Sequence, residues 1–254
     1  MRALITAILL CISVTVRADV NAVDYGFIPD DPTYDNTVKL DSFVQSDPDD
    51  TILYFPKGSY YFNSQPQIID KGITIRGGGT NVTTFVRNYV PSSYSDNLLH
   101  FTRTAVVKNI AILAKTQGGG AIKLEGLPAS SSVLRDLYIT AMTGGNYAIP
   151  LTLASSHRLG IRGITIDNVE LFAATIHGAW FQNVRGLTAN FQYYPAGGVV
   201  SHVVIQGSAG YRSSSIKINT RHLPFIYFYA TDGAKINTLN TAVSQSGSTG
   251  ITTQ

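Results

Sequence analysis

Carboxylates are scarce in the second part of this chain, so acid–base chemistry there must draw on a short list. From residue 101 onward the acidic residues are Glu125, Asp136, Asp167, Glu170 and Asp232. Hydrolysis of a glycosidic bond needs two carboxylates about 5 to 9.5 Å apart. Asp167 and Glu170 across a turn, or Asp136 one repeat earlier, can meet that requirement, and we predict them as catalytic residues. The alternative is that Asp136 and the Asp167-Asn168 pair only form turns.

A second chemistry, β-elimination from a uronic acid, needs a base near the C5 proton and positive charge beside the carboxylate. Arg162, Arg185 and His177 are the catalytic candidates for these roles. Ca²⁺ could neutralise the carboxylate instead, but the repeat region has no acidic cluster that would suit this ion. Metal-ligand spacing is also absent among His157, His177, His202 and His222. We therefore predict no metal site and no other cofactor.

Four basic residues fall at the same place in successive repeats: Lys108, Arg135, Arg162 and Arg185. If the repeats stack in register, these side chains form a basic column with steps of about 4.8 Å. Stacked like charges repel, so such a column needs acidic neighbours or an anionic ligand. We predict Lys108 and Arg135 as substrate-binding residues, because basic side chains suit carboxylate or sulfate groups. The alternative is a solvated face whose long side chains cover apolar surface.

Aromatic residues supply further binding candidates. Tyr193, Tyr194 and Trp180 offer large, partly polar rings on which a sugar could stack. In the run 227–229, strand alternation must send some rings inward and others outward. The glycine triplets at 77–79 and 118–120 lack the strand-to-helix context of a phosphate-binding loop, so we interpret them as turns.

The elements that must position these residues are short repeated strands. Five segments share one template of an apolar, a polar and a turn-forming residue followed by alternating apolar positions: 107–112, 134–139, 161–166, 184–189 and 200–205. Their starts lie 16 to 27 residues apart, and repeats of about this length are typical of solenoids. Period-two alternation beside Asn, Asp or Gly indicates strands that meet turns. The sequence therefore predicts an all-β, single-stranded right-handed parallel β-helix of about seven to nine coils.

The N-terminal part has the features of a module that closes the first coil. Residues 37–44 carry apolar side chains at helical spacing after a capping Asn36 or Thr37, which predicts a short amphipathic helix. An open solenoid end exposes unpaired backbone and apolar interior, so we expect this helix to cover it.

Several motifs in this region resemble the pectate-lyase superfamily. They are Asp24-Tyr25-Gly26, the helix-opening Thr37, Phe55-Pro56-Lys57-Gly58-Ser59-Tyr60 and Ile73-Thr74-Ile75-Arg76-Gly77-Gly78-Gly79-Thr80. The resemblance implies a right-handed β-helix that acts on or adheres to polysaccharide, as tailspike and depolymerase proteins of that group do. This chain has Asp35-Asn36 where the family usually has two acidic residues, and its first helix is shorter. The acidic cluster of the calcium-dependent lyases and the Asn-Thr-Asp run of the hydrolase branch are also missing from this sequence.

The domain organisation follows from composition. Residues 1–18 combine a positive start, an apolar run and small residues before Asp19, which predicts a secretory signal peptide and an exported protein. A membrane anchor is the alternative, although the run is shorter than the roughly 20 residues of a spanning helix. We predict a β-helix domain at 19–243 with its cap at 19–61, followed by a flexible tail at 244–254. Cys11 is the single cysteine, so the mature chain would have no disulfide.

Charge is distributed unevenly along the chain. Residues 19–100 hold 11 acidic and 5 basic side chains, whereas residues 101–254 hold 5 acidic and 12 basic ones. In an exported protein, a basic repeat region favours an anionic polysaccharide over nucleic acid as the partner. The leading hypothesis is lyase or hydrolase cleavage of an acidic polysaccharide, and the alternative is a non-catalytic glycan-binding adhesin or structural fibre component. The uncapped tail also suggests a homo-oligomer, for instance a trimer.

Overall fold

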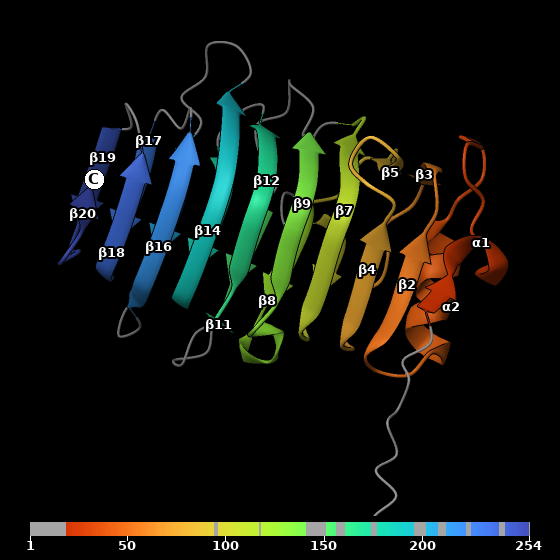
Figure 1. The fold of residues 1–254 in the computed structure, drawn as a ribbon, viewed down its shortest axis with the longest axis horizontal. Coiled ribbons are helices and arrows are strands. Elements are labelled where there is room, and N and C mark those ends of the chain that lie inside the picture. The colour runs from red at the N-terminus through yellow and green to blue at the C-terminus, as the bar shows by residue number, and fades with distance from the viewer. Residues whose placement is uncertain are drawn as a thin grey trace, which may run out of the picture.

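The computed structural model shows a right-handed parallel β-helix whose coils advance along one axis (Figure 1). It describes residues 19–93, 96–116, 118–140, 151–155, 161–173, 177–195, 202–207, 212–221, 225–238 and 242–253. The predicted signal peptide at 1–18 lies outside these residues. Within them, no helix combines the length and the apolar character that a membrane crossing requires. The predicted fold class is confirmed.

The strands form two parallel sheets. Sheet A contains β1 (Asp19–Asn21), β2 (Thr51–Phe55), β3 (Gly58–Phe62), β4 (Ile73–Gly77), β5 (Thr83–Arg87), β7 (Ala105–Ala114), β9 (Val133–Thr140), β11 (Ile161–Arg162), β12 (Thr165–Ala173), β14 (Val184–Pro195), β16 (Ser213–Arg221), β18 (Thr231–Thr238) and β20 (Thr252–Thr253). Sheet B contains β6 (Asn97–Phe101), β8 (Gly120–Glu125), β10 (Leu151–Ala154), β13 (His177–Gln182), β15 (His202–Gln206), β17 (Phe225–Tyr229) and β19 (Ala242–Ser246). A short 3₁₀ helix, η1 (Leu127–Ala129), follows β8.

Alternation along each strand fills the interior with stacked apolar side chains. One interior column runs through eight strands of sheet A: Leu53, Ile75, Val107, Leu134, Ile166, Ala189, Ile218 and Ile236. All of these side chains are buried. Burying apolar surface at every step of the stack is the main driving force for this fold. The residues between them point outward, where a ligand could reach them.

Two series of residues in the left-handed conformation bend the long strands of sheet A. The first series is Asn109, Asp136 and Asn168, with φ of 61°, 51° and 50°. The second series is Gly163, Gly186, Ser215 and Gly233, with φ of 62°, 67°, 56° and 63°. Asn, Asp and Gly adopt this conformation more readily than other residues. Four of these bends, at Asn109, Asp136, Gly163 and Gly186, are turn-forming positions of the sequence template. The bends set the direction in which the following outward side chains point.

Helix α2 (Thr37–Ser46) covers the N-terminal end of the solenoid, after the short helix α1 (Ala22–Tyr25) (Figure 1). It begins at the predicted Thr37 and buries Leu40, Phe43 and Val44 as part of the core. The Phe43 ring meets Tyr25 edge-on, with 5.2 Å between the ring centroids. The helix therefore closes the apolar interior, as its amphipathic pattern predicts.

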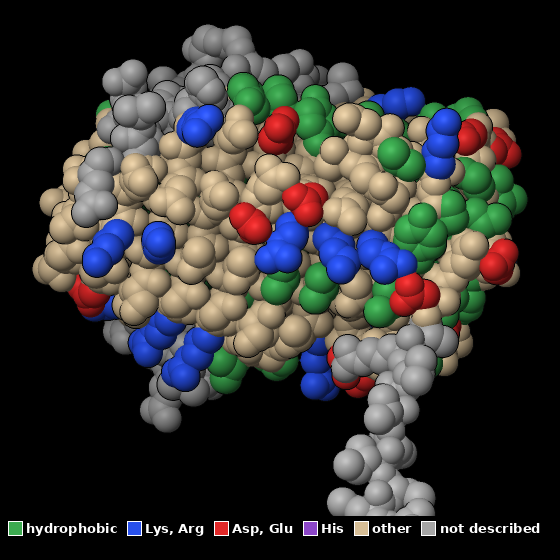
Figure 2. Space-filling view, viewed as in Figure 1, with side chains coloured by type: hydrophobic (Ala, Val, Ile, Leu, Met, Phe, Trp, Pro, Cys, Tyr) green, Lys and Arg blue, Asp and Glu red, His purple; other side chains and the backbone are tan. Residues whose placement is uncertain are grey.

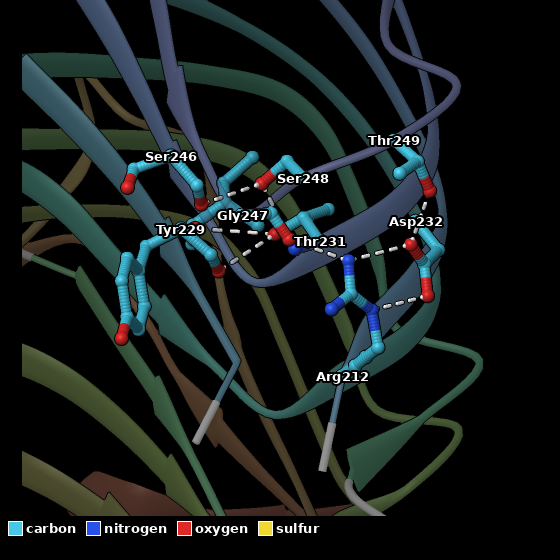
Figure 3. A network of polar contacts seen from close by, with 9 residues as sticks. Arg212, Tyr229, Thr231, Asp232, Ser246, Gly247, Ser248 and Thr249 are labelled. Atoms are coloured by element: carbon cyan, nitrogen blue, oxygen red, sulfur yellow. Dashed lines mark hydrogen bonds and ion pairs between the residues drawn. The ribbon is translucent and has the colours of Figure 1, made fainter. Parts of the chain in front are cut away.

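The C-terminal segment forms the last coil, since β19 pairs with β17 and β20 pairs with β18. Arg212 Nε lies 2.5 Å from Asp232 Oδ2, and Arg212 Nη2 donates to the Gly247 carbonyl at 2.6 Å (Figure 3). Thr249 also donates to Asp232, at 2.6 Å. The β-helix thus extends to residue 253, beyond the predicted end at 243. Ser, Thr and Gly supply backbone pairing and polar side-chain contacts here, which an apolar pattern does not reveal.

Candidate functional site

The structure divides the predicted basic column into two. Lys108 lies opposite Arg135, but Asp167, not Arg162, lies opposite Arg135 in the next strand. Arg162 pairs with Arg185 in a separate column. The prediction of a single column of four basic residues is therefore wrong.

Two similar segments of one repeat cause this difference. Both Arg162-Gly163-Ile164 and Asp167-Asn168-Val169 consist of a polar, a turn-forming and an apolar residue. The strand register stacks the second segment on Arg135-Asp136-Leu137. The first segment contributes Gly163 to the second series of bends. A repeat pattern in the sequence cannot separate the two segments, because both satisfy the same template.

The first basic column is flanked by carboxylates. It consists of Arg76, Lys108 and Arg135 on β4, β7 and β9. Arg76 Nη2 lies 2.6 Å from Asp19 Oδ2, and Arg135 Nε lies 3.2 Å from Asp167 Oδ2. Figure 2 shows the row of basic side chains over these strands, with acidic side chains near both of its ends. Carboxylates therefore neutralise the two arginines at the ends of the column, which reduces the repulsion between its stacked positive charges.

Two of the predicted carboxylates, Asp136 and Glu170, face one groove, which we name the acidic groove. It has a volume of about 420 Å³ and follows the first series of bends across β7, β9 and β12. Its lining is Gly79, Thr80, Asn81, Asn109, Asp136, Leu137, Tyr138, Asn168 and Glu170. Asn168 Nδ2 donates a hydrogen bond of 2.6 Å to Asp136 Oδ1. Glu170 lies opposite Tyr138 of the neighbouring strand.

Asp167, the third predicted carboxylate, does not line the acidic groove. It forms the ion pair with Arg135 and accepts a hydrogen bond of 3.3 Å from Asn190 Nδ2. The structure therefore brings Asp136 and Glu170 together and gives Asp167 a neutralising role.

A second groove, the amide groove, continues the first toward the C-terminal coils. It has a volume of about 470 Å³ and shares Asn168 with the acidic groove. Its lining is Asn168, Asn190, Phe191, Gln192, Asn219, Thr220, Arg221 and Asn237. Asn190, Asn219 and Asn237 occupy one register position on β14, β16 and β18. Amides both donate and accept hydrogen bonds, as do sugar hydroxyls, so this lining suits a polyhydroxylated chain.

An aromatic strip borders the two grooves. The ring centroids of Tyr138 and Phe172 are 4.8 Å apart, and those of Phe172 and Tyr194 are 4.5 Å apart with nearly parallel planes. Figure 2 shows hydrophobic side chains gathered over the arrow ends of β9, β12 and β14, beside an acidic side chain. Tyr194 was predicted, whereas Tyr138 and Phe172 were missed. Their outward positions by strand alternation, in register with Tyr194 and Glu170, were the signal that could have found them.

The other predicted residues lie elsewhere. Trp180 stands in β13 of sheet B, between Thr152 and Val204, so it does not join the aromatic strip. His177 belongs to the same sheet B strand, whereas Arg162 and Arg185 belong to sheet A. The predicted elimination site is thus split between two sheets. The side chains of His177 and Tyr193 lie outside the described part of the structure.

Sheet B carries a separate cluster of charged side chains. Glu125 Oε2 lies 2.7 Å from His100 Nε2 and 3.0 Å from Lys123 Nζ. Burial and the charge of Lys123 lower the pKa of His100 below its ordinary value. In the part of the chain that the structure describes, no three His, Cys, Asp or Glu side chains gather to hold a metal ion.

Comparisons with known proteins bear on the fold. No protein-family model matches this sequence, and no curated protein is similar to it. The Agl-KA catalytic domain has a similar structure, with a TM-score of 0.51 and 14% sequence identity over 92% of this chain and 46% of that one. The ORF18 protein of Geobacillus virus E2 matches with a TM-score of 0.36 and 12% identity, over 93% of this chain and 61% of that one.

Tailspike protein 3 of bacteriophage CBA120 matches with a TM-score of 0.36 and 10% identity, over 92% of this chain and 57% of that protein. This chain therefore spans about half of the length of these structures. None of these three proteins is described as a member of the pectate-lyase superfamily, so the resemblance to that superfamily stays a prediction. At 14% identity, the likeness to the Agl-KA catalytic domain bears on the fold alone.

Proposed function

We propose that this protein is exported and acts on an acidic polysaccharide that lies across the coils of sheet A. One observation carries the proposal: Asp136 and Glu170 face the same groove, next to the strip of Tyr138, Phe172 and Tyr194. Aromatic rings stack on the apolar faces of sugars, and the adjoining amides can bind hydroxyls. The joined grooves cross successive strands, so an extended polymer would contact several coils at once.

Hydrolysis is the reaction that this geometry supports best. Asp136 and Glu170 stand on neighbouring strands, and Glu170 is level with Tyr138, two residues beyond Asp136. Diagonal neighbours of this kind lie about 7 to 8 Å apart. That spacing is compatible with the range in which one carboxyl group protonates the leaving oxygen and the other activates water or attacks the sugar. Elimination is less well supported, because Arg162 and Arg185 do not share a sheet with His177.

The test is an assay of the mature chain with a panel of acidic polysaccharides. New reducing ends would report hydrolysis, and ultraviolet absorbance of unsaturated products would report elimination. We expect Asp136→Asn and Glu170→Gln each to lower kcat about 10²- to 10⁴-fold, the usual contribution of a positioned acid or base. Glu125→Gln, on sheet B, is the matched control and should retain activity. Full activity of both groove variants would rule out the assigned roles.

A specific observation favours a second function, glycan binding without cleavage. Asp136 occupies the same bend series as Asn109 and Asn168, and it accepts a hydrogen bond from Asn168. This is the arrangement of a turn-stabilising residue. If the protein is an adhesin or fibre component, it will bind polysaccharide without releasing products, and Tyr138→Ala will weaken that binding. A stable trimer in sedimentation experiments would further favour a fibre component, and a monomer would favour a small enzyme.

A further inference from the structure

Arg221 differs from three other arginines of the described structure in what surrounds it. It ends β16 and lines the amide groove, where it is exposed. Arg76, Arg135 and Arg212 each form an ion pair with an aspartate. Within the described ranges, no carboxylate lies close enough to pair with Arg221. The amide groove therefore contains a guanidinium whose charge is not neutralised by the protein.

The register places Arg221 in line with the acidic groove. Glu170 lies opposite Gln192, and Gln192 lies opposite Arg221. The acidic and the cationic side chains thus project from the same position of the coil, two strand spacings apart, or about 10 Å along the solenoid axis. Gln192 between them is held by a hydrogen bond of 2.7 Å from the Tyr194 hydroxyl.

We infer that Arg221 binds the carboxylate or sulfate group of a sugar unit and thereby selects an acidic polymer. The inference rests on the proposed function, because it takes the two grooves as one binding site. A guanidinium presents a planar fork of N–H donors that matches a carboxylate or a sulfate, and the interaction is stronger than one between neutral groups. Asn219 and Asn237 beside it line the same groove and can bind the hydroxyls of the same unit.

Arg221, and not the predicted Lys108 and Arg135, then recognises the anionic group. Arg135 is paired with Asp167, and neither Arg135 nor Lys108 lines the amide groove. Arg221 has a free guanidinium inside the groove that also holds the amides. A polymer lying along the axis would then place an anionic group at Arg221 when another unit lies over Glu170.

The experiment measures binding by calorimetry with matched polymer pairs. Polygalacturonate and its methyl-esterified form test a carboxylate, and dextran sulfate and dextran test a sulfate. The variants are Arg221→Gln, Arg221→Lys and, as a control on the same strand, Lys217→Gln. Lys217 is exposed but does not line the amide groove. Circular dichroism checks that every variant is folded.

We expect the wild-type protein to bind the acidic member of one pair more tightly than the neutral member. The pair in which this occurs shows whether Arg221 binds a carboxylate or a sulfate. Arg221→Gln should weaken that binding about 10- to 100-fold and leave the neutral polymer unchanged. The affinity of Arg221→Lys for the acidic polymer should lie between those of the wild type and Arg221→Gln. Lys217→Gln should change this affinity less than about threefold.

One outcome overturns the inference while leaving the proposed function intact: Arg221→Gln weakens both members of a pair equally. A wild type that shows no preference for an acidic polymer overturns both the inference and the acidic substrate class of the proposed function. The proposed function fails separately if the wild type binds polysaccharide and Tyr138→Ala and Phe172→Ala leave that binding unchanged.

Discussion

Asp35 and Asn36 hold the N-terminal cap through backbone groups. Asp35 Oδ1 accepts hydrogen bonds from the backbone N–H groups of Thr37 and Asn63, and Oδ2 accepts one from Ser64. Asn36 is fully buried and bonds both the N–H and the carbonyl of Ile28. Since the oxygens of both side chains bond groups of the fold itself, Asp35 and Asn36 anchor the start of α2.

The charge of Asp35 makes the cap sensitive to acid. Burial alone would raise the pKa of this carboxyl, but hydrogen bonds from Ser64, Asn63 and Thr37 hold it below the ordinary value. Because the pKa of this carboxyl is lower in the native state than in the unfolded state, its charged form stabilises the fold at pH values above the unfolded-state pKa of about 3.9. This contribution is lost as the pH falls through the native pKa.

We therefore expect Asp35→Asn to lower the urea midpoint at pH 7 and to have a much smaller effect near pH 3. Urea unfolding of both proteins at the two pH values checks this. Asp24→Asn, an acidic residue of α1, is the control. An equal loss at both pH values would show that the charge of Asp35 does not matter.

At the scale of an element, the bends limit the size of the side chains that fit on the neighbouring strands. Gly77 ends β4, directly beneath the bend of β7. A Cβ atom added at Gly77 would lie 2.3 Å from the carbonyl oxygen of Asn109 and 2.8 Å from Thr83 Cβ. The backbone oxygen cannot move without disturbing its coil, so this position has room only for glycine.

Gly77→Ala should reduce the free energy of unfolding by about 2 kcal/mol or more, because overpacking against a rigid coil forces the backbone to shift. The control is Gly233→Asn, since Gly233 has φ of 63° and no atom near its added Cβ. Chemical denaturation should find this control within about 1 kcal/mol of the wild type. Comparable losses in the two variants would contradict the steric argument.

The strands and the bends could be predicted from the sequence, but their register could not. Period-two alternation of apolar residues and the Asn, Asp or Gly beside them specify a stacked coil. Whether Arg162 or Asp167 lies opposite Arg135 depends on which of two similar segments, 162–164 or 167–169, pairs with the preceding coil. Contacts between coils decide this, and the local sequence pattern does not show them. Tyr138 and Arg221 were missed for the same reason: each gains significance only from its cross-strand neighbours.

At the scale of the whole molecule, the two ends are closed differently. The N-terminal end is covered by α2 and its buried Phe43. The last coil ends with β19 and β20, in which no residue is buried. In a solenoid each coil is stabilised by its neighbours, so a coil with one neighbour and little core opens most easily.

Hydrogen exchange should therefore be fastest in β19 and β20 and slowest in the central strands β7 to β12. The ion pair of Arg212 with Asp232 holds the last coil (Figure 3), so Asp232→Asn should accelerate exchange there and leave β7 unaffected. Exchange followed by mass spectrometry of peptide fragments checks both statements. Uniform protection along the chain would indicate a single cooperative unit instead.

The uneven charge described for the sequence gives this rod a permanent electric dipole. The coils follow chain order along the axis (Figure 1), so the acidic residues gather toward the capped end and the basic residues toward the other. Near a polyanion the resulting torque turns the basic end forward before any contact forms, and added salt weakens it. The Arg221 half of the grooves lies toward that end, and so the molecule would arrive already oriented for binding.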